Sequence, residues 1–431
     1  MALQAQSALG LLAIPLLALL LSENRRALAL PALARIIAMG LVLQLVIAAA
    51  MLNIPASRTL FDWAGGAVQA LQSATLAGMR LVFGYLAGGA TPFDVRNPSA
   101  GFILAFQALP VILLISALSK LAYHWGLLQP IVRIVGRGLQ RSLGVSGPVG
   151  TSAAANILVG MVEAPLLVRP YLAQMSRAGL FATMTAGMAG VAGTVLALYA
   201  TLLEPVLPGA AGHLVVASVI SVPAALMLSA LMVPEAPAVT VLPGAPAEAG
   251  QDDIVIENPP ASSMDAIAQG TREGIELLVN VAAMLVVAVA LVALINQALG
   301  LVGAPLGLTL SLERLLGWVF APLAWLIGIP ASEAATAGSL LGAKTILNEF
   351  IAYLQMAALP AEALGPRSRL IMTYALCGFA NIGSLGILVG GMVAMVPQRR
   401  AEIVALGTKT VISGTLSTLM MAAVVGLLTP G

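Results

Sequence analysis

Two glutamates lie in stretches of sequence that are otherwise about as apolar as a lipid bilayer. Glu349 shares its segment with Lys344 and Asn348, and Glu163 follows Gly160 by three residues in a second apolar segment. An ionised side chain at membrane depth costs at least about 2.5–3.5 kcal/mol on insertion scales. Such residues persist mainly where they bind a substrate or an ion, so both glutamates are candidate site residues.

The composition of the 431-residue chain is typical of a membrane protein. Hydrophobic residues make up 60% of it and charged residues only 9%, whereas soluble domains carry about 25% charged residues. No basic cluster is dense enough to bind a phosphate backbone, so we expect no nucleic acid partner. Cys377 is the one cysteine, and His124 and His213 lie far apart in the sequence. We therefore expect no disulfide, no zinc site and no cofactor.

The apolar segments predict an all-α polytopic membrane protein. Eight of them approach the ~20 residues that a spanning helix needs. These segments are residues 8–21, 36–52, 102–123, 180–203, 214–232, 275–299, 370–395 and 403–428. Mixed polar and apolar patterns predict helices at the membrane interface, at residues 58–92, 129–144 and 310–325.

The distribution of arginines predicts the orientation of the spans. With eight spans and both termini on one side, most arginines of the connecting loops fall on the opposite face, which is then cytoplasmic. These are Arg25, Arg26, Arg133, Arg137, Arg141, Arg169, Arg177, Arg399 and Arg400. Both termini are then periplasmic, in a bacterial inner membrane. The proline-rich linker, residues 233–262, is cytoplasmic.

Two apolar segments are interrupted in a way that does not fit a spanning helix. Residues 147–175 have a polar tip near Glu163, and residues 331–359 have one near Glu349. Each arm is roughly ten residues long, about half of what a crossing needs. We interpret both as re-entrant hairpins, here called the first and second hairpins, whose tips lie in a protein-lined cavity.

The interrupted segments also repeat. Each hairpin precedes a span with small residues in its middle, at Gly187–Gly193 in the first unit and at Gly378–Ser384 in the second. An odd number of spans separates the two units, so they should be inverted relative to each other. This pattern is typical of a repeat-built secondary transporter whose site lies where the repeats meet.

At the second tip the chain resembles the bacterial-type concentrative nucleoside transporters. The motif of that family matches Gly342, Lys344, Asn348, Glu349, Phe350, Ile351, Ala352 and Tyr353. Glu163-Ala-Pro165 and Cys377-Gly-Phe-Ala-Asn381 are similar to further family segments. The resemblance implies eight transmembrane helices, two opposed re-entrant hairpins, inverted repeats and a homotrimer.

The resemblance also implies which parts of the chain move during transport and which form a static scaffold. The transport units would be residues 146–203 and 331–397, each a hairpin with its broken span. The scaffold would be residues 1–145 and 263–330. The fifth span, residues 204–232, the linker, residues 233–262, and the last span, residues 398–431, complete the chain.

Residues around the second tip match the family positions that hold a ribose. They are Glu349, Asn381 and Ser384, with Asn348 beside them. A carboxylate accepts hydroxyl protons, and an amide and a hydroxyl complete the set. Lys344 is expected to stabilise the tip, and pairing with Glu349 is its structural alternative.

The remaining substrate-binding candidates match positions near the nucleobase. They are Glu163, Val195 and Phe379, together with Met161 and Val162. Met161 and Val162 replace a glutamine and a threonine that contact the base in relatives. They cannot make those hydrogen bonds, so pyrimidine preference is not inherited and a purine-tolerant pocket is the hypothesis.

The coupling ion is left open between sodium and a proton. The sodium site implied by the resemblance matches Asn156, Val159, Gly190 and Val191, but Gly190 replaces a serine and removes an oxygen ligand. Thr194 is one candidate to replace that oxygen. The alternative is proton coupling through Glu163 or Glu349, because a desolvated carboxylate can exchange a proton.

The leading prediction is therefore a secondary transporter that imports nucleosides by cation symport with alternating access. The alternative is a proton-coupled importer of purine or modified nucleosides. An intramembrane enzyme is disfavoured, because the chain has no His-Glu-x-x-His motif and no nucleophile beside a histidine.

Overall fold

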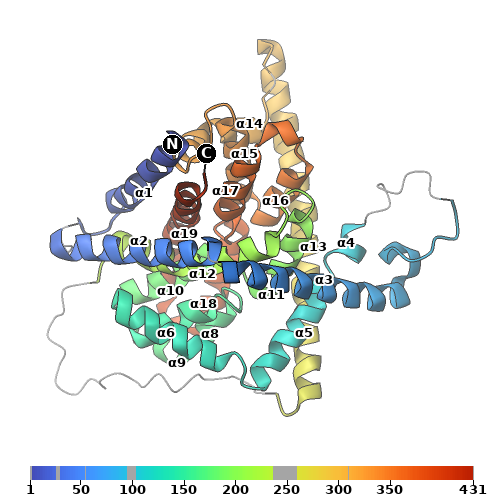
Figure 1. Cartoon of the computed structure of the whole chain (residues 1–431), viewed down its shortest axis with the longest axis horizontal. Coiled ribbons are helices and arrows are strands. Elements are labelled where there is room, and N and C mark those ends of the chain that lie inside the picture. Colours follow the sequence, from blue (N-terminus) through green and yellow to red (C-terminus); the bar gives the residue numbers. More distant parts are fainter. Residues whose placement is uncertain are drawn as a thin grey trace.

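The computed structural model describes residues 2–25, 30–53, 55–94, 103–235, 260–308 and 310–430, and within these ranges the chain is helical without strands (Figure 1). Most of the predicted linker, residues 236–259, lies outside the described residues. The helices are α1 (Ala2–Leu20), α2 (Leu30–Asn53), α3 (Pro55–Phe83), η2 (Gly84–Ala87), α4 (Leu104–Gln107), α5 (Val111–His124), α6 (Gln129–Leu143), α7 (Gly147–Ala155), α8 (Glu163–Leu166), α9 (Arg169–Leu172), α10 (Arg177–Ala189), α11 (Gly193–Leu203), α12 (Ala210–Met232), α13 (Ser263–Gly303), η4 (Ala304–Leu306), α14 (Leu312–Leu326), α15 (Ala334–Ile346), α16 (Glu349–Ala358), η5 (Ala361–Ala363), α17 (Pro366–Leu376), α18 (Ile382–Met395), η6 (Pro397–Arg399) and α19 (Arg400–Leu428).

Seven segments of the described chain are long and apolar enough to cross a membrane. They are Leu3–Leu20, Leu30–Leu52, Leu104–His124, Arg177–Leu203, Ala210–Met232, Ser263–Gly303 and Pro397–Leu428. Each overlaps one of the predicted spans. The remaining predicted span, residues 370–395, is divided into α17 and α18, and α18 is a shorter apolar helix of 14 residues. The chain is thus a multi-pass helical protein.

The predicted first hairpin differs from expectation in its second arm. Its first arm is the nine-residue helix α7, but the second arm is two single-turn helices, α8 and α9. Pro170 near the start of α9 has no N–H to donate and cannot continue the preceding helix. The predicted second hairpin is more regular, because α15 and α16 pack against each other and are joined by Leu347 and Asn348.

The order of elements repeats along the chain. Helices α5, α6, the first hairpin, the pair α10–α11 and α12 are followed by α13, α14, the second hairpin, the pair α17–α18 and α19. Packing repeats too: α6 contacts the first arm of the first hairpin, as α14 contacts the first arm of the second. Helices α10 and α17 each pack against both α12 and α19, so the two broken spans share one pair of neighbours (Figure 1).

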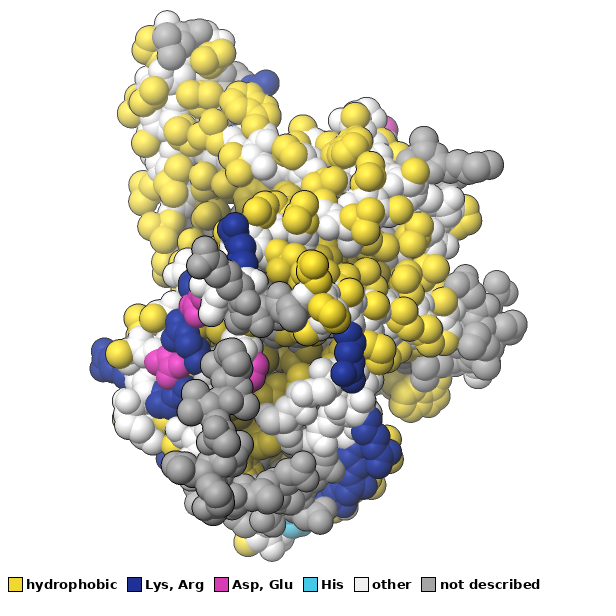
Figure 2. All heavy atoms as spheres, turned by 90° about the vertical axis from the view of Figure 1, so that its left-hand side faces the viewer, with side chains coloured by type: hydrophobic (Ala, Val, Ile, Leu, Met, Phe, Trp, Pro, Cys, Tyr) yellow, Lys and Arg dark blue, Asp and Glu magenta, His cyan; other side chains and the backbone are white. Residues whose placement is uncertain are grey.

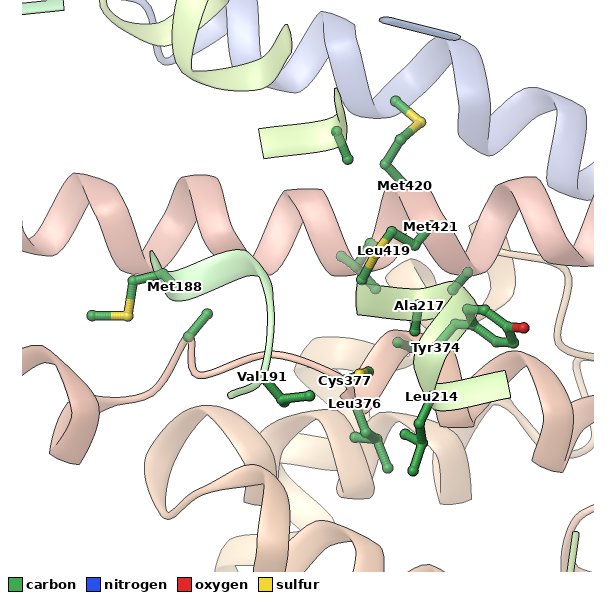
Figure 3. Packing of buried hydrophobic residues seen from close by; sticks show 14 of the residues in the cluster. Met188, Val191, Leu214, Ala217, Tyr374, Leu376, Cys377, Leu419, Met420 and Met421 are labelled. Carbon is green, nitrogen blue, oxygen red and sulfur yellow. The ribbon is translucent and has the colours of Figure 1, made fainter. Parts of the chain in front are cut away.

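The two broken spans meet where their helices stop. The N–H of Phe379 donates to the carbonyl oxygen of Gly190 at 3.2 Å. A Cβ added to Gly378 would lie 2.8 Å from the carbonyl oxygen of Ala189, so only glycine permits this approach. Figure 3 shows buried residues packed around this region from four helices and the two breaks. They include Met188, Val191, Leu214, Ala217, Tyr374, Leu376, Cys377, Leu419, Met420 and Met421.

Charged side chains gather towards one end of the molecule, opposite a largely hydrophobic face (Figure 2). Glu23, just after α1, accepts hydrogen bonds from Arg177 at 2.8 and 3.0 Å, and also pairs with Lys409 of α19. The hydrogen bond from Arg177 is the main cause that lowers the pKa of Glu23 to about 2. This ion cluster ties the end of α1 to α10 and α19.

Replacing Glu23 tests the cluster. We expect Glu23→Gln to lower the apparent melting temperature by about 1–3 °C at neutral pH, since a partly exposed ion pair contributes modestly. The folded pKa lies below the ordinary value of 4.5. The contribution is therefore fully present above about pH 4.5 and is lost as the pH falls towards 2. Thermal unfolding of both proteins from neutral to acidic pH measures it.

Glu362→Gln is the matched control, because Glu362 is an exposed residue of η5 at which the described structure shows no ion pair. A difference between wild type and Glu23→Gln that did not shrink below pH 4.5, or an equal loss in Glu362→Gln, would contradict the assignment.

Candidate functional site

Glu349 is a buried carboxylate with two hydrogen-bond donors. Its side chain is 4% exposed. Oε1 accepts from the hydroxyl of Tyr199 at 2.6 Å, and Oε2 accepts from Nδ2 of Asn381 at 2.9 Å. A carboxylate has about four lone-pair sites. Two remain to accept protons from a ligand.

Two asparagines start the helices that meet at this carboxylate. Asn381 precedes α18, and its Oδ1 accepts from the N–H of Ser384 at 2.7 Å. Asn348 precedes α16, and its Oδ1 accepts from the N–H of Ile351 at 2.9 Å. Asparagine is favoured at this position because it satisfies an N–H that has no helical partner. Glu349 is the first residue of α16, where the helix dipole favours negative charge.

Sequence reasoning missed Tyr199. This tyrosine is 3% exposed and lies on α11, and its ring packs 5.2 Å from that of Tyr353 and 6.1 Å from that of Phe350. One signal was available: Tyr199 follows the predicted contact Val195 by four residues, so both lie on one face of the helix. A phenol on an otherwise apolar helix needs a buried partner.

Lys344 does not pair with Glu349. Its side chain is fully buried, and Nζ donates to the carbonyl oxygen of Ala375 at 2.9 Å and to Oγ1 of Thr418 at 2.7 Å. Ala375 lies near the end of α17 and Thr418 lies on α19. The lysine therefore fastens the second tip to the broken span and to the last helix.

Three more predicted residues, one from the ribose set and two from the base set, lie in or just before the first turns of α18 and α11. Ser384 is in the first turn of α18 and is 8% exposed, and Phe379 is half-buried two residues before Asn381. Val195 is in the first turn of α11 and is 6% exposed.

The tip of the first hairpin packs against α18 at a point well beyond the start of that helix, where the Glu349 cluster lies. Glu163 is exposed at the start of α8, with its carboxylate against Gly160. Met161 packs on Gly187 of α10, where an added Cβ would lie 3.1 Å from the Cβ of Met161. Val162 packs on Gly391, where an added Cβ would lie 2.8 Å from Cγ1 of Val162.

Gly391 is nine residues beyond the start of α18, or about 14 Å along its axis. In the described part of the chain, no hydrogen bond joins Glu163 to the Glu349 cluster. The first tip, at Val162, and the Glu349 cluster therefore lie at different positions along the same helix.

The predicted ion-binding residues lie at the breaks of α7 and α10. Asn156 follows α7, is 3% exposed, and donates from Nδ2 to the carbonyl oxygen of Ala186 at 2.8 Å. Gly190 ends α10, and Val191 is buried next to it. Val159 lies in the turn before the first tip. Across the described ranges, no group of three or more His, Cys, Asp or Glu side chains could hold a metal ion.

The chain is similar in sequence to known transporter families over almost its whole length. Family models described as "Na+ dependent nucleoside transporter" match residues 9–86 (N-terminus) and 213–426 (C-terminus). A model described as "Nucleoside recognition" matches residues 105–206. Nucleoside permease NupC of Helicobacter pylori is 37% identical over 426 residues, which cover 98% of this chain and 97% of the permease.

Solved structures show the same similarity in three dimensions. CNTnw in an inward-facing substrate-bound state superposes with a TM-score of 0.87 at 37% identity, covering 99% of this chain and 97% of that one. A CNTnw variant in an outward-facing state superposes with a TM-score of 0.89 at 36% identity, covering 99% and 97%.

The two asparagines allow the Glu349 contact to be separated from helix capping. We expect Asn348→Ala to destabilise the protein by about 0.5–2 kcal/mol, the value of one lost cap. Asn381→Ala loses a cap and also leaves Oε2 of Glu349 without its donor, which adds about 1–3 kcal/mol. Thermal unfolding of the purified variants measures the difference. Equal losses in the two variants would mean that the bond from Asn381 to Glu349 contributes nothing.

Proposed function

This chain belongs to the Na+-dependent nucleoside transporter family, and from that premise we propose that it imports nucleosides across a bacterial inner membrane by cation symport. The family is one of permeases, so the protein is a transporter and not an enzyme. The observation that carries the proposal is the buried Glu349 carboxylate, held between two helix starts by Tyr199 and Asn381.

In the proposed site, Glu349 binds the ribose. Its free lone pairs accept protons from two sugar hydroxyls, and Ser384 provides a further hydroxyl near the start of α18. Tyr199 and Asn381 hold the carboxylate in one orientation before the sugar arrives, which lowers the entropy cost of binding. A sugar without hydroxyls would leave these buried polar groups unpaired, so discrimination should be strong.

The proposed base contacts are mostly apolar. Val195 and Phe379 lie near the second tip, and Met161 and Val162 close the first tip against α10 and α18. Glu163 is the polar group facing this region. Because methionine and valine offer shape and no directional hydrogen bonds, the pocket should accept purines as well as pyrimidines.

Alternating access is proposed to move the two hairpins and their broken spans, residues 146–203 and 331–397, against a scaffold of residues 1–145 and 263–330. CNTnw has been solved in inward-facing and outward-facing states. Residues 204–232 and 398–431 form spans between and after these units, and residues 233–262 form a cytoplasmic linker. Both hairpins are proposed to be re-entrant and inverted relative to each other, with both termini periplasmic.

The proposed assembly is a homotrimer in the lipid bilayer. Helix α13 presents exposed apolar side chains along its length, among them Val286, Leu291 and Leu294 at more than half exposure. Such a surface is stable only against lipid or a neighbouring copy.

Sodium is the proposed coupling ion. The family to which the chain belongs is sodium-dependent, and the oxygens near Asn156 are neutral donors suited to a monovalent cation. Proton coupling through Glu163 or Glu349 is the alternative outcome of the test.

The role of Glu349 is tested by uptake into proteoliposomes. We expect Glu349→Gln to reduce uptake at low nucleoside concentration by at least about 10²-fold, because hydrogen bonds to a charged group contribute about 1.5–3 kcal/mol each. Tyr199→Phe should raise KM by about three- to tenfold, since one orienting bond worth about 1 kcal/mol is lost. Tyr353→Phe is the control: this hydroxyl donates to the carbonyl oxygen of Thr373 and not to Glu349. Wild-type uptake by Glu349→Gln would refute the assignment.

Base preference is tested by competition. Adenosine and guanosine should each inhibit uptake of labelled uridine at concentrations close to that of unlabelled uridine, because the tip residues at positions 161 and 162 cannot select by hydrogen bonding. Strict selectivity for uridine in this panel would show that another group reads the base.

A further inference from the structure

We infer that Ser221 of α12 supplies the hydroxyl ligand of the sodium site, in the space left by the absent side chain of Gly190. The inference rests on the proposed sodium coupling and adds a ligand from a helix outside the first hairpin and its broken span. Neither the spacing of the motifs nor the resemblance points to this residue.

The main observation behind this inference is the environment of Gly190. A Cβ added there would lie 3.0 Å from Nδ2 of Asn156 and 3.1 Å from Oγ of Ser221. The Cβ of Ser221 is the next nearest atom, at 4.0 Å, and no atom of Thr194 is among these three. A hydroxyl on α12 thus occupies the region into which a serine at position 190 would project. The NH2 group of the Asn156 amide borders the same point.

The hydroxyl of Ser221 is free to act as an acceptor. It is 1% exposed and donates its proton to the carbonyl oxygen of Ser218 at 2.8 Å. A hydroxyl has one proton and two lone pairs. Because the proton is used within the helix, the lone pairs remain for a cation.

Other oxygens near the break also lack donors. Oδ1 of Asn156 accepts no hydrogen bond within the described structure. The carbonyls of Val159 and Val191 accept none from the described backbone, because the helices before them have ended. Buried polar groups are normally paired. A bound cation would give these acceptors and the Ser221 hydroxyl the partner that they lack.

The chemistry of this donor set selects a monovalent hard cation. All four groups are neutral oxygens, which hard cations prefer over nitrogen or sulfur. Divalent cations usually require carboxylates, and none is part of the set. Sodium bound here would join α12 to α7 and α10, and so couple ion binding to the position of the first hairpin.

Serine hydroxyls in helices commonly donate to a preceding backbone carbonyl. The bond from Ser221 to Ser218 is therefore not by itself evidence for a cation site. Ser229 on the same helix makes an equivalent bond, to the carbonyl oxygen of Leu226 at 3.0 Å, and is also 1% exposed. The difference lies in the neighbours, because a Cβ added at Gly190 would meet the hydroxyl of Ser221. Ser229 is therefore a matched control.

The experiment measures sodium-dependent thermal stability of the purified full-length protein in detergent, without nucleoside. Sodium chloride is titrated against choline chloride at constant ionic strength. Wild type should be stabilised by sodium, and Ser221→Ala should require at least about tenfold more sodium for half of the effect. Ser229→Ala should match wild type. In choline chloride alone, the Ser221→Ala variant should unfold as one cooperative species.

A relocation of the hydroxyl gives the second test. The double variant Gly190→Ser/Ser221→Ala removes the hydroxyl at position 221 and adds one at position 190, where it no longer meets the Ser221 hydroxyl. Its sensitivity to sodium should therefore return towards that of wild type. An unchanged sodium response in Ser221→Ala would overturn the inference, as would an equal loss in Ser229→Ala. So would a wild type that ignores sodium and takes up nucleoside on a pH gradient.

The proposed function is judged separately. Nucleoside-dependent stabilisation and uptake are measured in parallel, and their absence would count against nucleoside transport while the sodium titration still decides on Ser221.

Discussion

The hydrogen bond between the Phe379 N–H and the Gly190 carbonyl connects the two places where helices stop inside the apolar core. A helix that ends within a bilayer leaves N–H and C=O groups that water cannot satisfy, and each costs several kcal/mol if unpaired. The crossing of the two broken spans solves part of this problem, because one break supplies the donor and the other the acceptor. Gly378 permits the contact, since a side chain there would meet the backbone of Ala189.

The same crossing explains how charged groups persist in this environment. Glu349 and Lys344 are both buried, and each has hydrogen-bond partners other than the other charged group. The carboxylate has Tyr199 and Asn381 as donors and the positive end of a helix beside it, while the ammonium has acceptors on two other helices. The carboxylate consequently keeps unused acceptor sites, and the lysine keeps the tip in place.

The inferred sodium site illustrates how one ligand role can be taken over by another helix. Gly190 has no side-chain oxygen, but the backbone there comes close to α12, which carries Ser221. A ligand on α12 would make ion binding depend on the packing of that helix against the first hairpin. A side chain at position 190 would be in tight contact with the hydroxyl at position 221, at 3.1 Å from the added Cβ.

The sequence alone determined the class of fold, most of the helices and the second-tip motif, because hydrophobic length and residue type are local properties. It predicted Glu349 and Asn381 as site residues, and the structure places these two side chains within hydrogen-bond distance of each other. Pro170 was a sequence signal that the second arm of the first hairpin is not one helix, because proline has no N–H to donate. Only the tertiary structure decided that Tyr199 reaches Glu349, that Lys344 fastens α15 to α17 and α19, and that Ser221 lies against Gly190. These contacts join helices far apart in the chain, and their geometry depends on how the helices cross, which no local pattern of residues specifies.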